Sequence, residues 1–281
     1  MTKGQWFPGK MSKALNQLRE DLKAVDLAIE LIDARIPFSS RNPKLSNLLE
    51  NKKHIVLLHK ADSAEKEATE RWLAYYQNFA DKAMPFSVKN TRYLKQLMGY
   101  LKEQENSLKP KKIKRPLRMI FVGIPNVGKS TLINLFVHKA VTKTGNQPGI
   151  TRGRQWIRIM PGMELLDTPG ILQPRIEKNT INPLSAVGAL PAGKTDQQES
   201  ATWLINCYLK EGKGHYIEER YRVELSKPEQ ILEQIGLSQG CLQSAGKVNR
   251  ERTAALILRD YQNGALGRVT LEKPEDFKNV F

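Results

Sequence analysis

A short segment in the middle of the chain restricts the possible folds more than any other feature of the sequence. Residues 123–130 read Gly-Ile-Pro-Asn-Val-Gly-Lys-Ser and fit the pattern G-x-x-x-x-G-K-[ST]. The apolar run Met119–Val122 precedes this segment, and a helical pattern over residues 131–136 follows it at once. In such a strand–loop–helix unit, backbone N–H groups and the helix N-terminus surround a phosphate. The segment therefore predicts a phosphate-binding loop after a parallel strand.

The side chains of this loop have distinct expected roles. Lys129 is expected to neutralise charge on the β- and γ-phosphates, and the Ser130 hydroxyl to ligate Mg²⁺. The predicted nucleotide contacts of the loop are Asn126, Val127, Gly128, Lys129, Ser130 and Thr131. The loop alone does not distinguish ATP from GTP.

The base is indicated by a second segment, His59-Lys60-Ala61-Asp62, which follows the strand-like run 55–58. The Asp62 carboxylate can accept two hydrogen bonds from the N1–H and exocyclic amine of guanine, a donor pair that adenine lacks. The stem of Lys60 can lie along the plane of the base. His59 stands where the usual pattern has Asn, so we expect one contact to the base or the loop to differ and guanine affinity to fall. Residues Ser87, Val88 and Lys89 resemble the last base-contacting loop of GTPases.

The order of these segments is unusual. In ordinary small GTPases the phosphate loop comes first and the base-reading segment near the end, whereas here the base-reading segment comes first and Asp167-Thr168-Pro169-Gly170 comes last. This order indicates a circular permutation. Asp167 is expected to support the Mg²⁺ shell, and the Gly170 N–H to sense the γ-phosphate. Thr151 is predicted to be the metal-binding threonine of the first switch, with an ordinary turn residue as the alternative. Lys129, Thr151 and Gly170 are the predicted catalytic residues.

The remaining pattern predicts the α/β class. Apolar runs at 27–33, 55–58 and 119–122 alternate with helical patterns at 12–22, 64–79 and 93–105, which indicates a mostly parallel sheet with helices on both faces. Residues 155–160 and 163–166, joined by Pro161-Gly162, read as a hairpin. We expect a circularly permuted P-loop GTPase domain over residues 1–178, with an N-terminal segment 1–24 and a basic linker 108–118. A small α-helical domain is expected over 179–281, with helices near 197–209, 228–235 and 246–261.

The charge is distributed unevenly. The chain has 45 Lys/Arg and 29 Asp/Glu, a formal net charge of +16, yet residues 180–281 hold 13 of each sign. The excess therefore lies in residues 1–179, where it indicates a polyanionic partner such as nucleic acid. Solubility and a solvated linker are the alternative. The predicted RNA-binding residues are Lys111, Lys112, Lys114, Arg115, Arg152 and Arg154.

Other features of the sequence argue against a membrane protein, a secreted protein and a protein with a cysteine metal site. No apolar run approaches the roughly 18–20 residues that span a bilayer, and the first residues do not read as a signal or transit peptide. We expect a cytoplasmic protein that binds no membrane. Cys207 and Cys241 have no metal-like spacing and are expected to be free thiols.

With these motifs in place, the chain resembles the ribosome biogenesis GTPase A family, also called YlqF. The resemblance covers most of residues 5–173 and weakens towards the C-terminus. It is carried by Trp6-Phe7-Pro8-Gly9, Asp33-Ala34-Arg35-Ile36-Pro37, Ser39-Ser40-Arg41-Asn42-Pro43, residues 124–131, Pro148-Gly149-Ile150-Thr151 and residues 165–172. It implies a GTPase that acts in late assembly of the large ribosomal subunit.

The residues that would position the attacking water depart from known patterns. GTPases of the Ras type use a Gln just after Asp-x-x-Gly, and this chain has Ile171 there. The resemblance implies a His after Trp-Phe-Pro-Gly, and this chain has Lys10. Lys10 is a catalytic candidate through stabilisation of γ-phosphate charge, with a surface or phosphate-backbone role as the alternative. The resemblance also implies a K⁺ ion at Asn126, for which a loop-stabilising amide is the alternative.

The leading hypothesis is a GTP-hydrolysing assembly factor that uses Mg²⁺ and GTP. It would also use K⁺ if Asn126 binds that ion. Its unassisted turnover is expected to be on the order of 10⁻⁴ s⁻¹, accelerated by the large-subunit precursor and its rRNA. The runner-up is a GTP-dependent RNA-binding scaffold with little hydrolysis, and a GTPase that acts on another RNA is a third possibility. Trp156 is expected either to stack on a base or to pack in the hairpin. Off the ribosome we expect a monomer.

Overall fold

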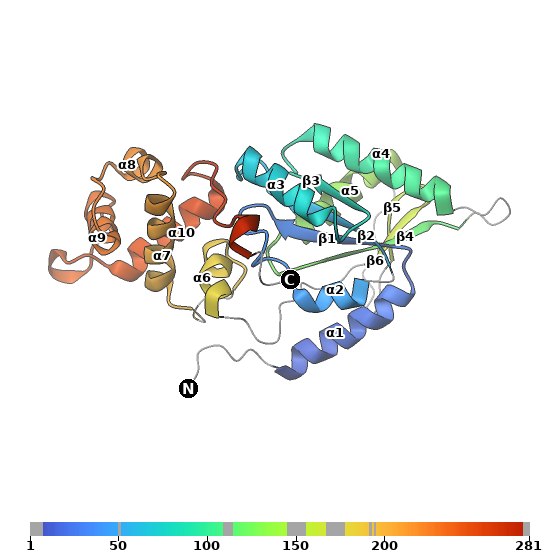
Figure 1. The fold of residues 1–281 in the computed structure, drawn as a ribbon, viewed down its shortest axis with the longest axis horizontal. Helices are drawn as coiled ribbons and strands as arrows, with labels where there is room; N and C mark the ends of the chain where they lie inside the picture. Colours follow the sequence, from blue (N-terminus) through green and yellow to red (C-terminus); the bar gives the residue numbers. More distant parts are fainter. Residues whose placement is uncertain are drawn as a thin grey trace. The chain divides into compact units, whose positions relative to one another are not determined.

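A single sheet organises the larger part of the molecule (Figure 1). The structure is a computed structural model that describes residues 8–49, 52–108, 115–144, 156–166, 178–190, 193 and 195–277. The strands lie in the order β3-β2-β1-β4-β6-β5. They are β1 (Leu27–Asp33), β2 (Lys53–His59), β3 (Lys82–Pro85), β4 (Leu117–Gly123), β5 (Trp156–Met160) and β6 (Met163–Leu166).

The sheet is parallel apart from one strand. β1 pairs in parallel with both β2 and β4, β2 with β3, and β4 with β6. Only the β5–β6 pair is antiparallel, joined by the turn at Pro161 and Gly162. Every residue of β1 is buried, as expected of a parallel strand covered on both faces. The predicted α/β class and the hairpin are therefore confirmed.

Helices cover both faces of this sheet. Leu18 and Leu22 of α1 (Pro8–Lys23) pack with residues of α2 (Pro43–Leu49) against Ile120 and Val122 of β4. The opposite face of β4 carries Phe121, which stacks on Phe136 of α5 (Lys129–Thr144) at a centroid distance of 6.1 Å. Successive strand residues point to opposite faces. The two sets of contacts therefore lie on opposite sides of the sheet.

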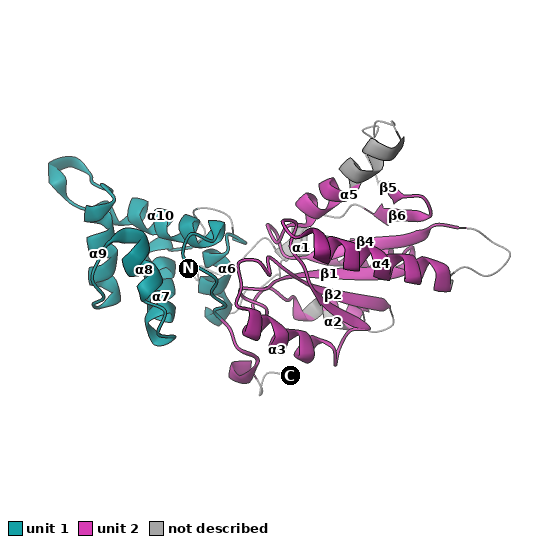
Figure 2. Cartoon of the chain, turned by 90° about the horizontal axis from the view of Figure 1, so that it is seen from above, with its two compact units in different colours: residues 1–5, 176–271 teal, residues 6–175, 272–281 magenta. Residues whose placement is uncertain are grey.

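The chain divides into two compact units (Figure 2). One contains residues 6–175 together with 272–281, and the other contains residues 176–271 together with 1–5. The first unit also holds α3 (Lys66–Tyr76), α4 (Thr91–Leu108) and the 3₁₀ turn η2 (Pro274–Phe277). The second unit is helical. Its elements are α6 (Lys178–Ala186), α7 (Gln197–Lys210), α8 (His215–Tyr221), α9 (Pro228–Ser238), η1 (Ser244–Gly246) and α10 (Arg250–Asn263).

The helical unit has its own core. Tyr208 of α7 and Tyr261 of α10 are fully buried, with an edge-to-face ring contact at 6.3 Å. Each phenol donates a hydrogen bond to a backbone carbonyl, Tyr208 to Leu266 at 2.9 Å and Tyr261 to Val269 at 3.2 Å. These bonds fix the segment after α10 against the helices, because a buried hydroxyl needs a partner. None of the helices described is long and apolar enough to cross a bilayer.

Candidate nucleotide site

The predicted nucleotide-binding segments follow strands that end at one edge of the sheet. The phosphate loop follows β4, the base-reading segment starts at the last residue of β2, and residues 87–89 follow β3. Because β1 to β4 are parallel, their carboxyl ends share that edge. Ligands of open parallel sheets bind outside the carboxyl ends of the strands. The fold therefore brings together segments that are distant from one another in the chain.

The phosphate loop uses backbone conformations that most residues avoid. Gly123 has φ of 150° and Gly128 has φ of 111°, while Asn126 adopts a left-handed φ of 58°. A Cβ atom on Gly123 would lie 2.5 Å from the carbonyl oxygen of Leu31 in β1. Glycine is required there because the loop leaves β4 in direct contact with the neighbouring strand.

Lys129 is held against the phosphate loop. Its ammonium donates hydrogen bonds to the carbonyl oxygens of Gly123 at 2.9 Å and Ile124 at 2.8 Å. Burial lowers the pKa of Lys129 to about 8, so the ammonium is still mostly protonated at neutral pH. The group thus offers a cation at the N-terminus of α5, which is where an anion is favoured.

Lys60 is anchored by the end of β1. Its ammonium lies 3.0 Å from Oδ2 of Asp33, and its backbone has a left-handed φ of 59°. Asp33 also accepts hydrogen bonds from the Arg35 guanidinium, at 2.9 Å to each carboxylate oxygen. Burial alone would raise the pKa of Asp33, but Arg35 and Lys60 outweigh it and hold that pKa far below its usual range. The buried carboxylate therefore stays charged and fixes the lysine predicted to lie along the base.

Asp62 meets the loop that follows β3. Its Oδ2 lies 3.3 Å from the Lys89 ammonium, and the Ala61 N–H donates to the carbonyl of Phe86 at 3.1 Å. Burial raises the pKa of Asp62, yet hydrogen bonds from Ser87 and Lys89 more than compensate and lower it overall. The two segments predicted to contact the base are thus adjacent, and the carboxylate is ionised, as an acceptor for two N–H donors must be.

The side chain of His59, the first residue of the base-reading segment, lies against the phosphate loop. A Cβ atom placed on Gly128 would lie 2.6 Å from Cε1 of the His59 ring. The ring also stacks on Phe86 at a centroid distance of 5.7 Å. Burial lowers the pKa of His59 to about 4 despite the opposing influence of Asp33, so the imidazole is neutral at neutral pH. The residue that stands where the usual pattern has Asn thus lies close to Gly128 of the phosphate loop.

The residues present fit a magnesium nucleotide as far as they are described. The exposed Ser130 follows Lys129 at the start of α5, and a hydroxyl oxygen suits a hard cation such as Mg²⁺. The other predicted ligands, Thr151 and Asp167, lie outside the described residues. So do Gly170, Ile171, Arg152, Arg154, Lys111, Lys112 and Lys114. Lys10 belongs to α1, and its side chain is not described.

Two predicted nucleic-acid contacts make contacts within the protein. Arg115 donates two hydrogen bonds of 2.7 Å to the carboxylate of Asp26, although half of its side chain is exposed. Trp156 packs at the margin of the core formed by α1, α2 and β4, with the Arg118 guanidinium 4.8 Å from its ring centroid. Of the two alternatives for Trp156, the structure favours packing in the hairpin. Cys207 and Cys241 are free thiols, as predicted.

Two features of the sheet unit were missed by sequence reasoning. Asp33 and Arg35 stood in a quoted motif, but nothing in their spacing indicated that they anchor Lys60. Glu272 lies far along the chain and is buried beside Ser39, with N–H donors from Phe38 and Ser39 at 2.7 and 3.0 Å. No local pattern marks Glu272, because its partners are more than 200 residues away.

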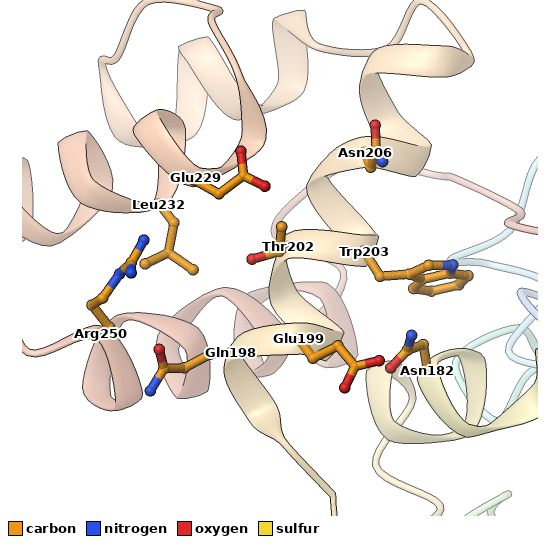
Figure 3. A pocket seen from close by; sticks show the side chains of 9 residues that line it. All are labelled: Asn182, Gln198, Glu199, Thr202, Trp203, Asn206, Glu229, Leu232 and Arg250. Carbon is orange, nitrogen blue, oxygen red and sulfur yellow. The ribbon is translucent and has the colours of Figure 1, made fainter. Parts of the chain in front are cut away.

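The helical unit contains a hollow of about 430 Å³ (Figure 3). It is lined by α6, α7, α9 and α10, with Trp203 and Asn206 on α7. Arg250 at its edge lies 3.4 Å from Glu233, and two further carboxylates, Glu199 and Glu229, line the hollow. All its lining residues belong to the helical unit.

Comparisons with known proteins agree with this geometry. The sequence model of a family described as "50S ribosome-binding GTPase" matches residues 118–210. A protein from Bacillus licheniformis called "Ribosome biogenesis GTPase A" is 40% identical over 281 residues, which cover 97% of this chain and 99% of that protein. The crystal structure of GNP-bound YlqF from T. maritima superposes with a TM-score of 0.68 at 27% identity, over 94% of this chain and 99% of the other. A GDP-bound YlqF structure gives a TM-score of 0.66 at 27% identity, over 92% and 100%. The chain belongs to the ribosome biogenesis GTPase A (YlqF) family of GTPases.

Proposed function

We propose that this chain hydrolyses GTP while it assists assembly of the large ribosomal subunit, and that the bound nucleotide controls its contact with rRNA. The observation that carries the proposal is the convergence of Lys129 and the ionised Asp62 at one edge of the parallel sheet. Lys129 suits phosphates, and Asp62 suits the donor edge of guanine. The large-subunit role is supported by the family description, and a role in ribosome assembly by the name of the relative that is 40% identical.

The charge distribution supports a nucleic-acid partner. Residues 180–281 carry equal numbers of basic and acidic side chains, so the net charge of +16 belongs to residues 1–179. The proposed rRNA contacts are Lys111, Lys112, Lys114, Arg152 and Arg154. Arg115 should attract RNA less strongly than these residues, because its charge is partly balanced by the ion pair with Asp26. Phosphate contacts of this kind release counterions, so the affinity for RNA should fall steeply with salt.

The proposed chemistry assigns one task to each group of residues. Lys129 and the loop N–H groups would hold the phosphates, Asp62 and Lys60 would hold the base, and Ser130 with Thr151 and Asp167 would hold Mg²⁺. The metal ion, when bound, supplies neutralisation of phosphate charge. Because Ile171 has no hydrogen-bonding side chain, water must be oriented by another group, and we propose that the ribosomal partner is needed for rapid turnover. Asn126 is the proposed K⁺ ligand.

The decisive experiment measures GTP turnover by the purified protein in KCl and in NaCl, each with and without large ribosomal subunits. Stimulation by large subunits, with small subunits as the matched control, is the expected result. Loss of that stimulation in NaCl would support the K⁺ role of Asn126. If small subunits stimulate equally, the assignment to the large subunit fails.

One alternative has a specific basis in the sequence. Lys10 and Ile171 both replace residues that could orient water, which favours a GTP-dependent RNA-binding scaffold with little hydrolysis. GTP binding without acceleration under any of the four conditions would favour this scaffold. In either case we propose a cytoplasmic protein that is monomeric away from the ribosome.

A further inference from the structure

The C-terminal segment of the chain belongs to the sheet unit and contacts the loop that follows β1. Glu272, the first residue of this segment, is only 4% exposed. Its carboxylate accepts hydrogen bonds from the N–H of Phe38 at 2.7 Å, from the N–H of Ser39 at 3.0 Å and from the Ser39 hydroxyl. A single carboxylate thus serves as acceptor for two backbone donors of a loop that lies more than 200 residues earlier in the chain.

Further contacts fix the C-terminal segment beside this loop. Phe277 stacks on Phe38 with the ring centroids 3.8 Å apart. The Trp72 indole of α3 donates a hydrogen bond to the backbone carbonyl of Glu272 at 2.9 Å. Backbone and ring contacts therefore fix the position from which the Glu272 side chain reaches the loop.

The loop that Glu272 holds is connected to the base-reading segment through Asp33. The hydroxyl oxygen of Ser40, the residue after Ser39, accepts a hydrogen bond from the Asp33 N–H at 3.0 Å. The Asp33 carboxylate in turn lies 3.0 Å from the Lys60 ammonium. Asp33, Ser39 and Ser40 are all buried. A continuous series of contacts therefore runs from Glu272 to the lysine predicted to lie along the guanine base.

Removal of the Glu272 carboxylate would take the acceptor away from two buried N–H groups of the loop. Buried donors without an acceptor are costly, so the loop would have to shift towards other acceptors. Because Ser40 belongs to the same loop, its hydrogen bond with Asp33 would be disturbed by that shift. Asp33 would then hold the Lys60 ammonium less firmly.

We propose that Glu272 is a positioning residue of the nucleotide site, which acts through Asp33 to hold Lys60 against the guanine base. This inference rests on the proposed function, since it requires a guanine nucleotide beside Lys60. Glu272 itself contacts neither the base nor the phosphates, and its effect on nucleotide affinity is indirect. That effect should disappear when Lys60 has no ammonium, whereas a general loss of stability would act with or without it.

The test is a double-mutant cycle between Glu272 and Lys60. Dissociation constants for GDP with Mg²⁺ are measured by titration calorimetry for the wild type, Glu272→Ala, Lys60→Met and the double variant. Glu272→Ala should weaken GDP binding about 3- to 10-fold, the effect of about one hydrogen bond. Lys60→Met keeps an apolar stem without the ammonium that Asp33 holds. In this background Glu272→Ala should change the affinity by less than about 2-fold, because residues that act in one series are not additive.

Three further variants complete the design. Glu272→Gln keeps an oxygen acceptor for the loop N–H groups and should retain most of the wild-type affinity. Glu275→Ala is the matched control, because it makes the same change in the same segment at a half-exposed side chain, 3.6 Å from Arg71, and it should bind GDP like the wild type. If Glu272→Ala does not fold, Glu272→Asp, whose shorter side chain draws the carboxylate away from the loop, replaces it in the cycle with the same expected pattern.

Two results would overturn the inference and leave the proposed function intact. One is an equal loss of GDP affinity with and without the Lys60 ammonium, because Glu272 would then act on the fold as a whole. The other is an unchanged affinity in the Glu272 variant, or a loss in Glu272→Gln as large as in Glu272→Ala. Failure of the wild type to bind GDP would overturn both proposals.

Discussion

Glu272 gives the sheet unit a stability that should depend on pH. Its carboxylate is buried and accepts hydrogen bonds from the N–H groups of Phe38 and Ser39 and from the Ser39 hydroxyl. Its own carbonyl accepts a hydrogen bond from the Trp72 indole at 2.9 Å. Burial raises the pKa of Glu272 from an ordinary value of 4.5 to about 7, even though these donors act in the opposite direction.

The sign of the effect follows from proton binding. Between pH 4.5 and 7 the folded protein holds a proton on Glu272 that the unfolded chain has released. The stabilising contribution is therefore fully present below pH 4.5 and is lost as the pH rises through about 7. Each pKa unit corresponds to 1.36 kcal/mol, so the difference between pKa values of 4.5 and about 7 amounts to about 3 kcal/mol.

The substitution that isolates this effect is Glu272→Gln, which keeps an oxygen acceptor and cannot ionise. Urea unfolding followed by tryptophan fluorescence, at intervals from pH 4.5 to 8, gives the free energy of unfolding for each protein. From pH 4.5 to 8, the free energy of unfolding of the wild type should fall by about 3 kcal/mol relative to that of Glu272→Gln. Glu275→Gln is the control, because Glu275 is half exposed and lies 3.6 Å from Arg71. If the gap between Glu272→Gln and the wild type is constant from pH 4.5 to 8, Glu272 ionises normally and the reasoning is wrong.

Three further predictions concern the nucleotide site. Gly123→Ala should destabilise the protein by about 1–3 kcal/mol in urea unfolding, because its Cβ would meet the Leu31 carbonyl at 2.5 Å; unchanged stability would contradict the contact. Lys129→Met should weaken binding of GDP and GTP in calorimetry by about 10- to 100-fold, the effect of a charged hydrogen bond, and an unaffected affinity would remove this lysine from the site. Asp62→Asn should weaken GDP binding by a similar factor without improving ADP binding, whereas Lys89→Met, which removes the ion pair but leaves the Asp62 carboxylate in place, should have a smaller effect.

The buried strands were the most predictable part of the fold. Predicted runs 27–33, 55–58 and 119–122 correspond to β1, β2 and β4, because strands covered on both faces are mostly apolar. β3 was not predicted as a strand, since Lys82–Pro85 is short and begins with an exposed lysine. Its place in the sheet depends on pairing with β2, which leaves no local pattern.

Long helices were predicted from the sequence more successfully than short ones. Residues 197–209 and 228–235 match α7 and α9 to within a few positions, whereas α2 and α8, of seven residues each, were missed. Short helices depend on tertiary packing more than on their own periodicity. The predicted helix over 246–261 begins later than expected, because Asn249 caps α10 by accepting from the Arg252 N–H at 3.0 Å.

Side-chain chemistry of the site was predictable where it belongs to a motif. The positions of Lys129 and Asp62 follow from their strands and loops, since the carboxyl ends of parallel strands meet at one edge. The anchoring of Lys60 by Asp33 was not predictable, because it requires the register in which Asp33 lies opposite His59. The contact between His59 and Gly128 likewise joins loops that are distant in the chain.

The permuted order of segments places the helical unit directly after the last predicted nucleotide-site segment. Only residues 171–177 separate Gly170, the predicted sensor of the γ-phosphate, from α6 at the start of the helical unit. At the other end of that unit, the chain enters the sheet unit at Glu272, which binds the N–H groups of Phe38 and Ser39 shortly after Asp33. In an unpermuted GTPase the phosphate loop leads the chain, and no such arrangement follows from its order. Two of the covalent connections of the helical unit thus lead to segments that are close in sequence to predicted nucleotide-site residues.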